Sequence, residues 1–256
     1  MRPIKVERQA AFVLHTRPYR ETSLVVEAIT RDYGRIALVA KGVRRPRSAM
    51  RGVLMAFQPL EMTWSGKGEV VTLHNAEWQG GQPLLAGRAL LCAYYLNELL
   101  LNLLPREDAH EQVFDHYAQT LQALSGHTVN LVAEPVAQSQ PSQESAFFSA
   151  SLRYFEKSLL AELGYGLLLT HDVGGNAIDP DQRYLYEMES GPRPLADSSA
   201  AAGTISGQTL LDMSAESFSH PVTLSESKAL MRSLMAFYLN GRQLHSRRLF
   251  EDLADL

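Results

Sequence analysis

The first 80 residues alternate between short apolar runs and turn-forming residues, a pattern typical of β-strands. Five such runs can be distinguished: Ala10–Thr16, Ser23–Thr30, Arg35–Ala40, Leu54–Trp64 and Glu69–Trp78. Asp32-Tyr33-Gly34 separates the second and third runs, and Ser65-Gly66-Lys67-Gly68 separates the last two, as expected of tight hairpin turns. Five strands with two hairpins predict a small closed barrel, such as an oligonucleotide-binding (OB) barrel. An SH3-like barrel would produce a similar pattern, so strand counting alone leaves both open.

After Gly80 the apolar residues recur at spacings of three and four, which is the period of an amphipathic helix. Helices are expected near 90–104, 113–124, 148–163, 206–213 and 225–238. Gly164 stands where a left-handed C-cap is expected. Gly126–Glu144 has no clear period and is expected to be a mobile linker, while Asp172–Asp181 and Ser190–Gly203 are expected to be loops.

These patterns predict an α+β chain in two parts. Residues 1–80 form an N-terminal five-stranded OB-type β-barrel. Residues 81–256 form a C-terminal, mostly α-helical domain with partner-binding surfaces and a mobile loop at about 126–144.

The composition is that of a globular protein rather than a disordered chain, with 45% hydrophobic and 20% charged residues among 256. The single cysteine, Cys92, excludes an internal disulfide framework and a multi-cysteine zinc site, and its apolar neighbours predict that it is buried. The N-terminus lacks the apolar run of a signal peptide, and polar residues interrupt Ala89–Leu104. A cytoplasmic location without membrane contact is therefore expected.

The net charge of −4 hides a division between the two parts. Residues 1–80 carry 13 Lys and Arg against 7 Asp and Glu, a net charge of +6. Residues 81–256 carry 11 against 21, a net charge of −10. A basic barrel on an acidic body favours a polyanionic partner for the barrel, although chance asymmetry between two ordinary domains would look the same.

No catalytic or metal-binding constellation is found. The chain lacks the G-x-S-x-G elbow, the phosphate-binding loop and the dinucleotide-binding glycine motif. No two of the eight histidines have the i, i+4 spacing that places two ligands on one helix face. His171-Asp172 is a candidate acid/base pair, but solvated loop residues are the simpler interpretation. We expect no enzyme activity, no metal and no cofactor.

The strongest local signal is the segment Lys41–Arg51, which holds five basic residues and no acidic one directly after a predicted strand. The basic residues are Lys41, Arg44, Arg45, Arg47 and Arg51. Gly42 and Pro46 predict a loop, so the cationic groups would point outward and could follow a phosphate backbone. A solvated basic turn without a ligand is the alternative.

Aromatic side chains near basic residues could stack on unpaired bases. Tyr19 and Tyr33 lie in predicted turns, beside Arg17 and Arg20 and beside Arg31 and Arg35, respectively. Phe57 and Trp64 are expected in the barrel core or at its junction with the helices instead. Arg17, Tyr19, Arg20 and Arg35 therefore join the five loop residues as candidate DNA contacts.

Taken together, these segments resemble the RecO family of bacterial recombination mediators and DNA-repair proteins. The matching segments are Ala11–Arg17, Tyr19–Leu24, Gly34–Arg35, Leu38–Arg44, Gly66–Val70, Tyr95–Leu100, Leu163–Gly166 and Leu244–Leu249. The similarity spans nearly the whole chain, and the combination is specific although each piece alone is weak.

The resemblance implies an N-terminal OB domain and a C-terminal helical domain. It also implies binding of single-stranded and double-stranded DNA, annealing of complementary strands coated with single-strand-binding protein (SSB), and cooperation with RecR in loading RecA. Arg153 falls where the family's helical domain is thought to receive the acidic C-terminal tail of SSB, although a surface salt bridge with Glu156 or with the neighbours of Lys157 is the alternative. Some members carry a four-cysteine zinc site after the Leu-Gly-Tyr segment, whereas this chain has no cysteine there.

The leading hypothesis is a non-enzymatic mediator of DNA recombination and repair, cytoplasmic and associated with the nucleoid. The alternative is a protein-only adaptor whose basic barrel binds acidic peptide tails. A nuclease would need clustered carboxylates to hold a metal, and the seven acidic residues of the barrel region are widely spaced.

Overall fold

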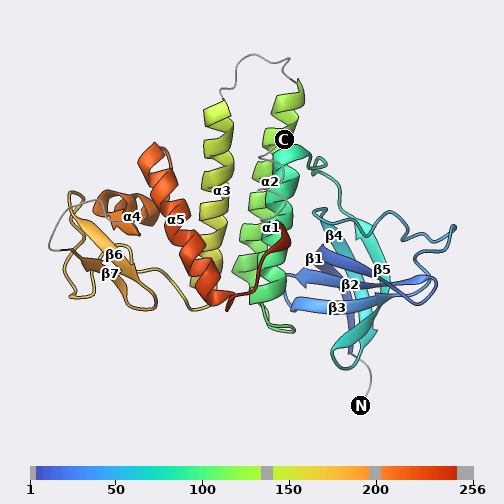
Figure 1. The fold of residues 1–256 in the computed structure, drawn as a ribbon. Coiled ribbons are helices and arrows are strands. Elements are labelled where there is room, and N and C mark those ends of the chain that lie inside the picture. Colours follow the sequence, from blue (N-terminus) through green and yellow to red (C-terminus); the bar gives the residue numbers. More distant parts are fainter. Residues whose placement is uncertain (1–3, 134–140, 196–202, 247–256) are drawn as a thin grey trace. The chain divides into compact units, whose positions relative to one another are not determined.

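The computed structural model describes residues 4–133, 141–195 and 203–246 (Figure 1). Within these residues the chain forms two compact units. The first comprises residues 4–133 and 244–246, and the second comprises residues 141–195 and 203–243. The change from strands to helices occurs near residue 80, as expected, but the first unit continues past it to include two helices.

Five strands form a closed barrel in the first unit, with the order β1-β2-β3-β5-β4. The strands are β1 (Ile4–Tyr19), β2 (Ser23–Thr30), β3 (Gly34–Ala40), β4 (Leu60–Gly66) and β5 (Val70–Trp78). β1 pairs with β4 to close the barrel, and β3 and β5 are the one parallel pair. This arrangement confirms the predicted five-stranded OB-type barrel.

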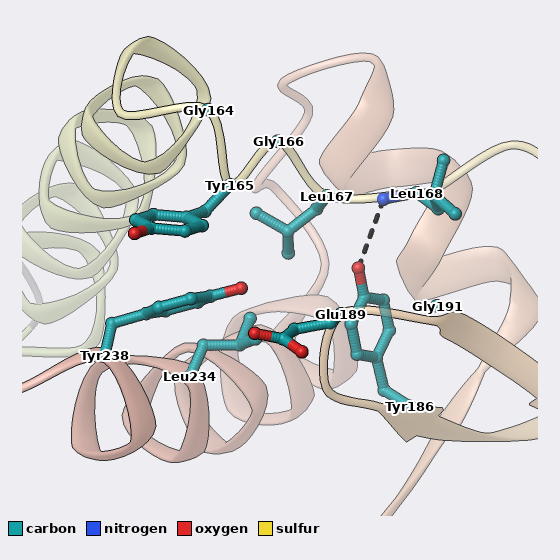
Figure 2. A pocket seen from close by; sticks show the side chains of 10 residues that line it. All are labelled: Gly164, Tyr165, Gly166, Leu167, Leu168, Tyr186, Glu189, Gly191, Leu234 and Tyr238. Carbon is teal, nitrogen blue, oxygen red and sulfur yellow. Dashed lines mark hydrogen bonds between the residues drawn. The ribbon is translucent and has the colours of Figure 1, made fainter. Parts of the chain in front are cut away.

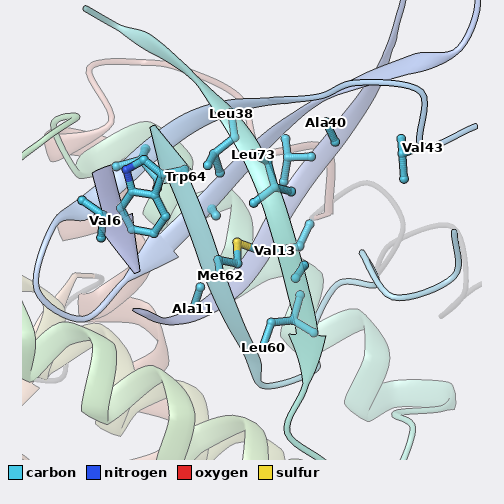
Figure 3. Close-up of a cluster of buried hydrophobic side chains, with 14 residues drawn as sticks. Val6, Ala11, Val13, Leu38, Ala40, Val43, Leu60, Met62, Trp64 and Leu73 are labelled. Atoms are coloured by element: carbon cyan, nitrogen blue, oxygen red, sulfur yellow. The ribbon is translucent and has the colours of Figure 1, made fainter. Parts of the chain in front are cut away.

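Alternating side chains of these strands fill the barrel interior (Figure 3). Leu38, Met62 and Trp64 are among the residues buried there, which confirms the core position of Trp64. Phe57 is also buried, and its ring packs edge-on against Tyr94, which is the alternative position at the junction with the helices. The fourth strand begins at Leu60 rather than at Leu54. Phe57 has a φ of 66°, and Pro59 cannot donate a ladder hydrogen bond, so the backbone before Leu60 is unsuited to a strand.

The turn between β2 and β3 requires glycine for two reasons. Gly34 has a φ of 64°, which non-glycine residues rarely adopt. A Cβ atom at this position would also lie 1.8 Å from the carbonyl oxygen of Asp108. The predicted hairpin is confirmed, and its turn lies directly against the chain between the two helices of the unit.

Helices α1 (Gly87–Leu103) and α2 (Glu111–Ala133) belong to the same unit as the barrel. The Phe12 ring of β1 packs against Phe114 and Tyr117 of α2, with centroid distances of 5.4 and 5.3 Å. Cys92 is buried in α1, as predicted. At the other end of the chain, the backbone N–H groups of His245 and Ser246 donate to the Glu98 carboxylate of α1. Residues 247–249 of the family signature lie outside the described residues.

The expectation of a linker at 126–144 is wrong at both ends. Helix α2 continues to Ala133, and helix α3 (Pro141–Glu162) begins at Pro141, while residues 134–140 lie outside the described residues. Extending a nucleated helix requires little from each added residue, so a stretch without strong periodicity can remain helical. Proline is also well suited to the first turn of a helix.

The second unit combines α3 with α4 (Gly207–Ser214), α5 (Pro221–Tyr238) and a small antiparallel sheet of order β7-β6-β8. The strands are β6 (Arg183–Glu187), β7 (Gly191–Pro194) and β8 (Thr204–Ser206). A loop was expected at 190–203, and this expectation is corrected, because Gly191–Pro194 forms strand β7. Residues 196–202 lie outside the described residues. Helix α5 begins four residues before the expected Ser225, and Gly164 has the predicted left-handed backbone, with a φ of 84°.

Candidate nucleic-acid interface

The turn between β1 and β2 and the basic segment after β3 lie at the same end of the barrel. Strand register places Tyr19 opposite Ser23, and Leu24 opposite Ala40. The Arg44 backbone N–H donates to the carbonyl oxygen of Thr22 at 2.9 Å. Lys41–Arg51 is therefore joined directly to the β1–β2 turn. We call this region the basic end, and define it by Arg17, Tyr19, Arg20, Lys41, Arg44, Arg45, Arg47 and Arg51.

Successive turns hold the backbone of the basic segment. The N–H of Arg45 donates to Gly42, that of Ser48 to Arg45, and that of Arg51 to Ser48, at 3.0–3.1 Å. Val43 is only 3% exposed and belongs to the barrel core. Val43 therefore attaches the segment to the barrel core, and the successive turns fix its backbone. The cationic side chains are directed outward although the segment forms neither a helix nor a strand.

All seven basic side chains of the basic end are exposed. None of them forms an ion pair with a carboxylate in the part of the chain that the structure describes. Glu21 is the only acidic residue in the two segments 17–24 and 41–57. This concentration of positive charge without internal neutralisation is what a polyanion backbone requires.

The opposite end of the barrel is different, because its arginines are paired. Arg31 forms ion pairs with Asp115 and Glu111, and Arg106 pairs with Glu27. Tyr33, considered as a base-stacking residue, packs edge-on against Trp64 at a centroid distance of 5.5 Å. These arginines contribute to the fold, and their carboxylate partners leave them little free charge for a ligand.

Tyr19 and Arg20 are brought together at the β1–β2 turn. The Arg20 guanidinium carbon lies 5.3 Å from the centroid of the Tyr19 ring, within the range of a cation–π contact. The Tyr19 residue remains 38% exposed. A phenol ring and a guanidinium that already contact each other can present stacking surface and charge together to a nucleic-acid strand.

Arg35 does not join the basic end, and its inclusion among the candidate DNA contacts is corrected. Its Nε donates to the Leu104 carbonyl oxygen at 3.0 Å, and its Nη1 lies 3.3 Å from a Glu27 carboxylate oxygen. Its side chain is only 16% exposed, and burial lowers the pKa of Arg35 below its ordinary value, with Glu27 opposing that effect. The residue holds β3 to the end of α1.

Arg153 is buried in the second unit rather than free on a helix surface. Its Nε and Nη2 atoms donate to the two carboxylate oxygens of Glu156, at 2.6 and 2.5 Å. The residue is 6% exposed, and Glu156 is 1% exposed. The salt bridge with Glu156 that the sequence left open as the alternative is present, but the pair is buried rather than at the surface.

A hollow of about 250 Å³ in the second unit has the wrong charge for DNA (Figure 2). The Tyr165 and Tyr238 rings are stacked on one side of it, with a centroid distance of 4.3 Å, and Glu189 faces the same space. Burial and the Glu189 carboxylate raise the pKa of the Tyr238 hydroxyl. Its ten lining residues include no basic side chain, so it does not suit a phosphate.

The candidate acid/base pair His171-Asp172 is not assembled. The Asp172 carboxylate accepts hydrogen bonds from the backbone N–H groups of Gly174 and Asn176, both at 2.8 Å. These bonds close a local turn, and those from Asn176 contribute most to lowering the pKa of Asp172. Within the described ranges no group of three His, Cys, Asp or Glu side chains is placed to hold a metal ion. Nor does any helix described there have the length and apolar character to cross a membrane.

Comparison with known proteins identifies the family. Residues 1–81 match the family model described as Recombination protein O N terminal, and residues 85–136 match Recombination protein O C terminal. The DNA repair protein RecO of Dechloromonas aromatica (strain RCB) is 56% identical over 252 residues, covering 98% of both chains. The DNA repair protein RecO of Azoarcus sp. (strain BH72) is 52% identical over 256 residues, again covering 98% of both. With both family models matched and such identity over nearly its full length, the chain belongs to the recombination protein O family of DNA repair proteins.

Proposed function

We propose that this protein is a non-enzymatic DNA-binding and strand-annealing mediator of recombination in DNA repair. The observation that carries the proposal is the basic end of the OB barrel, where seven exposed cationic side chains have no ion-pair partner among the described residues. Their charge would neutralise phosphates of single-stranded or double-stranded DNA and release condensed counterions.

Annealing follows from charge neutralisation rather than from covalent chemistry. Two complementary strands repel each other through their phosphates, and a shared cationic surface lowers that repulsion and raises their local concentration. Base pairing then supplies the driving force, so no nucleotide hydrolysis is needed. These cationic contacts are to the backbone, and the activity is expected to show little sequence preference.

The proposed partners are SSB-coated single strands and RecR, with RecA loading as the indirect result, in the cytoplasm at the nucleoid. This part of the proposal is supported by membership of the family. The acidic C-terminal tail of SSB is among the proposed partners, and Arg153 is its proposed contact. This contact requires a change in the structure. Because Glu156 already occupies the Arg153 guanidinium, a tail carboxylate would have to replace Glu156.

Fluorescence anisotropy of a labelled single-stranded oligonucleotide across a salt series tests the proposal. The parent is compared with the Arg44→Ala/Arg45→Ala/Arg47→Ala variant. The control variant, Lys5→Ala/Arg8→Ala/Lys67→Ala, removes the same charge from other parts of the barrel region. Each lost phosphate contact should reduce the slope of log Kobs against log salt by about 0.7–0.9, so the loop variant should lose roughly 2–3. The control should keep the parent slope.

Annealing is followed with the same proteins by energy transfer between donor-labelled and acceptor-labelled complementary strands. The loop variant should anneal more slowly than the control. If the two variants had equal slopes of log Kobs against log salt and equal annealing rates, the loop would not be part of the DNA site. If the parent bound acidic peptides but no DNA even at low salt, the adaptor function would replace the mediator function. Shortening of the labelled DNA with magnesium or manganese would indicate a nuclease.

A further inference from the structure

A hollow of about 320 Å³ lies within the basic end, beside the segment that carries its charge. Its lining residues are Leu24, Val43, Arg44, Met50, Arg51, Gly52 and Leu54. Val43 is buried in the barrel core, and Leu24, Met50 and Leu54 are half-buried against that core. The floor of the hollow is therefore apolar and is an outward extension of the packed barrel interior.

The rim of the hollow is cationic. Arg44 and Arg51 both line it, both are exposed, and neither has an ion-pair partner among the residues described. Gly52, next to Arg51, has a φ of 85°, and a Cβ atom there would meet nothing within 4 Å. The mouth of the hollow is thus open, with an apolar floor below and two arginines available for anions.

A hollow with apolar side chains at its floor and two cations at its rim suits a flat, partly apolar group that carries negative charge on both sides. In a DNA strand that group is a nucleobase, since a phosphate stands on either side of each nucleoside. We propose that this hollow takes one unpaired nucleobase of a bound strand, while Arg44 and Arg51 contact the phosphates that flank it. This inference rests on the proposed DNA binding and adds to it a subsite that binds a nucleobase.

The size and surroundings of the hollow favour one base over other occupants. Its volume is at the lower end of the range for small-ligand sites, about 300–1,000 Å³, so it suits a single base rather than a stacked run. An acidic peptide with an apolar side chain shares the required chemistry. DNA is favoured because the other unpaired cations of the basic end extend beyond this hollow, as a long polyanion requires.

Insertion of a base would distinguish single strands from duplexes. A base in a duplex must be unstacked and unpaired before it can enter, which costs a few kcal/mol. An unpaired base enters without breaking a base pair. The subsite would therefore add affinity for single strands through burial of the base, and this contribution should depend little on salt.

The test compares two single strands with the same number of phosphates, one of oligodeoxythymidine and one made entirely of abasic nucleotides. The parent should bind the base-containing strand about tenfold more tightly, through burial of the apolar surface of one base. The Met50→Gln variant makes the hollow more polar while keeping its size and charge, and it adds no aromatic ring that could itself stack on a base. That variant should reduce the difference to about twofold or less and keep the parent's affinity for the abasic strand and its salt slope.

Met55→Gln is the matched control, because Met55 lies in the same segment, is 44% exposed and does not line the hollow. It should keep the tenfold preference. Leu54→Ser is a second variant that makes the floor of the hollow polar, and it should also reduce the preference. Urea unfolding of each variant establishes that the barrel is intact.

Three results would overturn the inference. Equal affinity of the parent for the two strands would exclude a base subsite while leaving the proposed DNA binding in place. A preference that survives both Met50→Gln and Leu54→Ser would locate base recognition elsewhere. If an aspartate-rich peptide ending in phenylalanine binds the parent but not Met50→Gln, while the two strands bind equally, the hollow is a peptide site. Failure of the parent to bind either strand would instead contradict the proposed function itself.

Discussion

The side-chain amide of Asn97 on α1 donates a hydrogen bond to the carbonyl oxygen of Leu14 on β1, at 2.8 Å. The same Asn97 accepts a hydrogen bond from the Tyr117 hydroxyl of α2 through its Oδ1 atom. Asn97 and Tyr117 are both buried, and burial raises the pKa of Tyr117 above its ordinary value. One asparagine therefore connects the barrel with both helices of the first unit.

Replacing Asn97 with Ala is expected to destabilise the protein by about 2–5 kcal/mol. The Leu14 carbonyl and the Tyr117 hydroxyl each lose a partner in a buried site, and each loss costs about 1–3 kcal/mol. Urea unfolding at pH 7 measures the loss. The control is Asn102→Ala on the same helix, since the Asn102 amide donates only to the Glu98 carbonyl one turn away and is half-buried. Equal losses for the two variants would contradict the buried connection.

The stability contributed by Asp115 should depend on pH. The hydrogen bonds from the Arg31 guanidinium, at 3.0 and 3.1 Å, hold the pKa of Asp115 below its ordinary value. A carboxyl whose pKa is lower in the folded state stabilises that state above the unfolded pKa of about 3.9, and the effect is lost as the pH falls through the folded pKa. Both side chains are more than 40% exposed, so the contribution is under about 1 kcal/mol.

Asp115→Asn measures this contribution. The variant should be slightly less stable than the parent in urea at pH 7, and the difference should vanish as the pH is lowered from 4 toward 2. Added sodium chloride at pH 7 should reduce the difference as well, because exposed ion pairs are screened by salt. A difference that stays constant between pH 7 and pH 2 would show that the ion pair is not its cause.

The buried pair of Arg153 and Glu156 is expected to be strongly coupled. Removing one member of such a pair leaves the other charge buried, which typically costs about 3–5 kcal/mol. Arg153→Met and Glu156→Leu should each show a loss of that order. In a double-mutant cycle the double variant should lose at least about 1 kcal/mol less than the sum of the two single losses. Additive losses would mean that the two side chains do not stabilise each other.

This coupling bears directly on the proposed contact with the SSB tail. A loss of tail binding in an Arg153 variant has two explanations, the missing guanidinium and a weakened second unit. Glu156→Gln separates them, because it removes the competing carboxylate from the guanidinium while it also weakens the unit. Stronger tail binding in Glu156→Gln would support the Arg153 contact, and weaker binding in proportion to the loss of stability would argue against it.

The fold of the barrel was predictable because local signals agree with tertiary packing. The second strand, Ser23–Thr30, was predicted with its observed bounds, and Gly34 marks a turn that requires a positive φ. The small β7-β6-β8 sheet was missed because its strands are only three to five residues long, and β7 consists of Gly, Arg and two Pro residues. Such strands form through pairing with neighbours rather than through their own propensity. The linker was missed for a related reason, because helix propagation does not require a periodic apolar face.

The candidate site was predictable only where charge is concentrated in sequence. Lys41–Arg51 contains no carboxylate, and its cationic side chains are indeed exposed and without ion pairs among the described residues. Arg35 looked equivalent in sequence, but its partners, Glu27 and Leu104, are 8 and 69 residues away. Pairing over such distances is set by strand register and helix packing. The apolar hollow beside Arg44 was likewise invisible, since Leu24 and Leu54 meet there only after the barrel closes.

The contrast between Arg35 and Arg45 gives a prediction that separates structural arginines from DNA-contacting ones. Arg35→Ala removes the bonds to Leu104 and Glu27 and should destabilise the protein by about 1–3 kcal/mol, because the Leu104 carbonyl loses its donor in a half-buried site. Its slope of log Kobs against log salt for a single strand should equal that of the parent.

Arg45→Ala changes only an exposed side chain, so its stability should stay within about 0.5 kcal/mol of the parent. Its salt slope should fall by about 0.7–0.9. Urea unfolding and anisotropy on the same two preparations provide both quantities. If Arg35→Ala reduced the slope as much as Arg45→Ala while both remained folded, Arg35 would have to leave Glu27 on binding DNA, and the separation between the two ends of the barrel would be wrong.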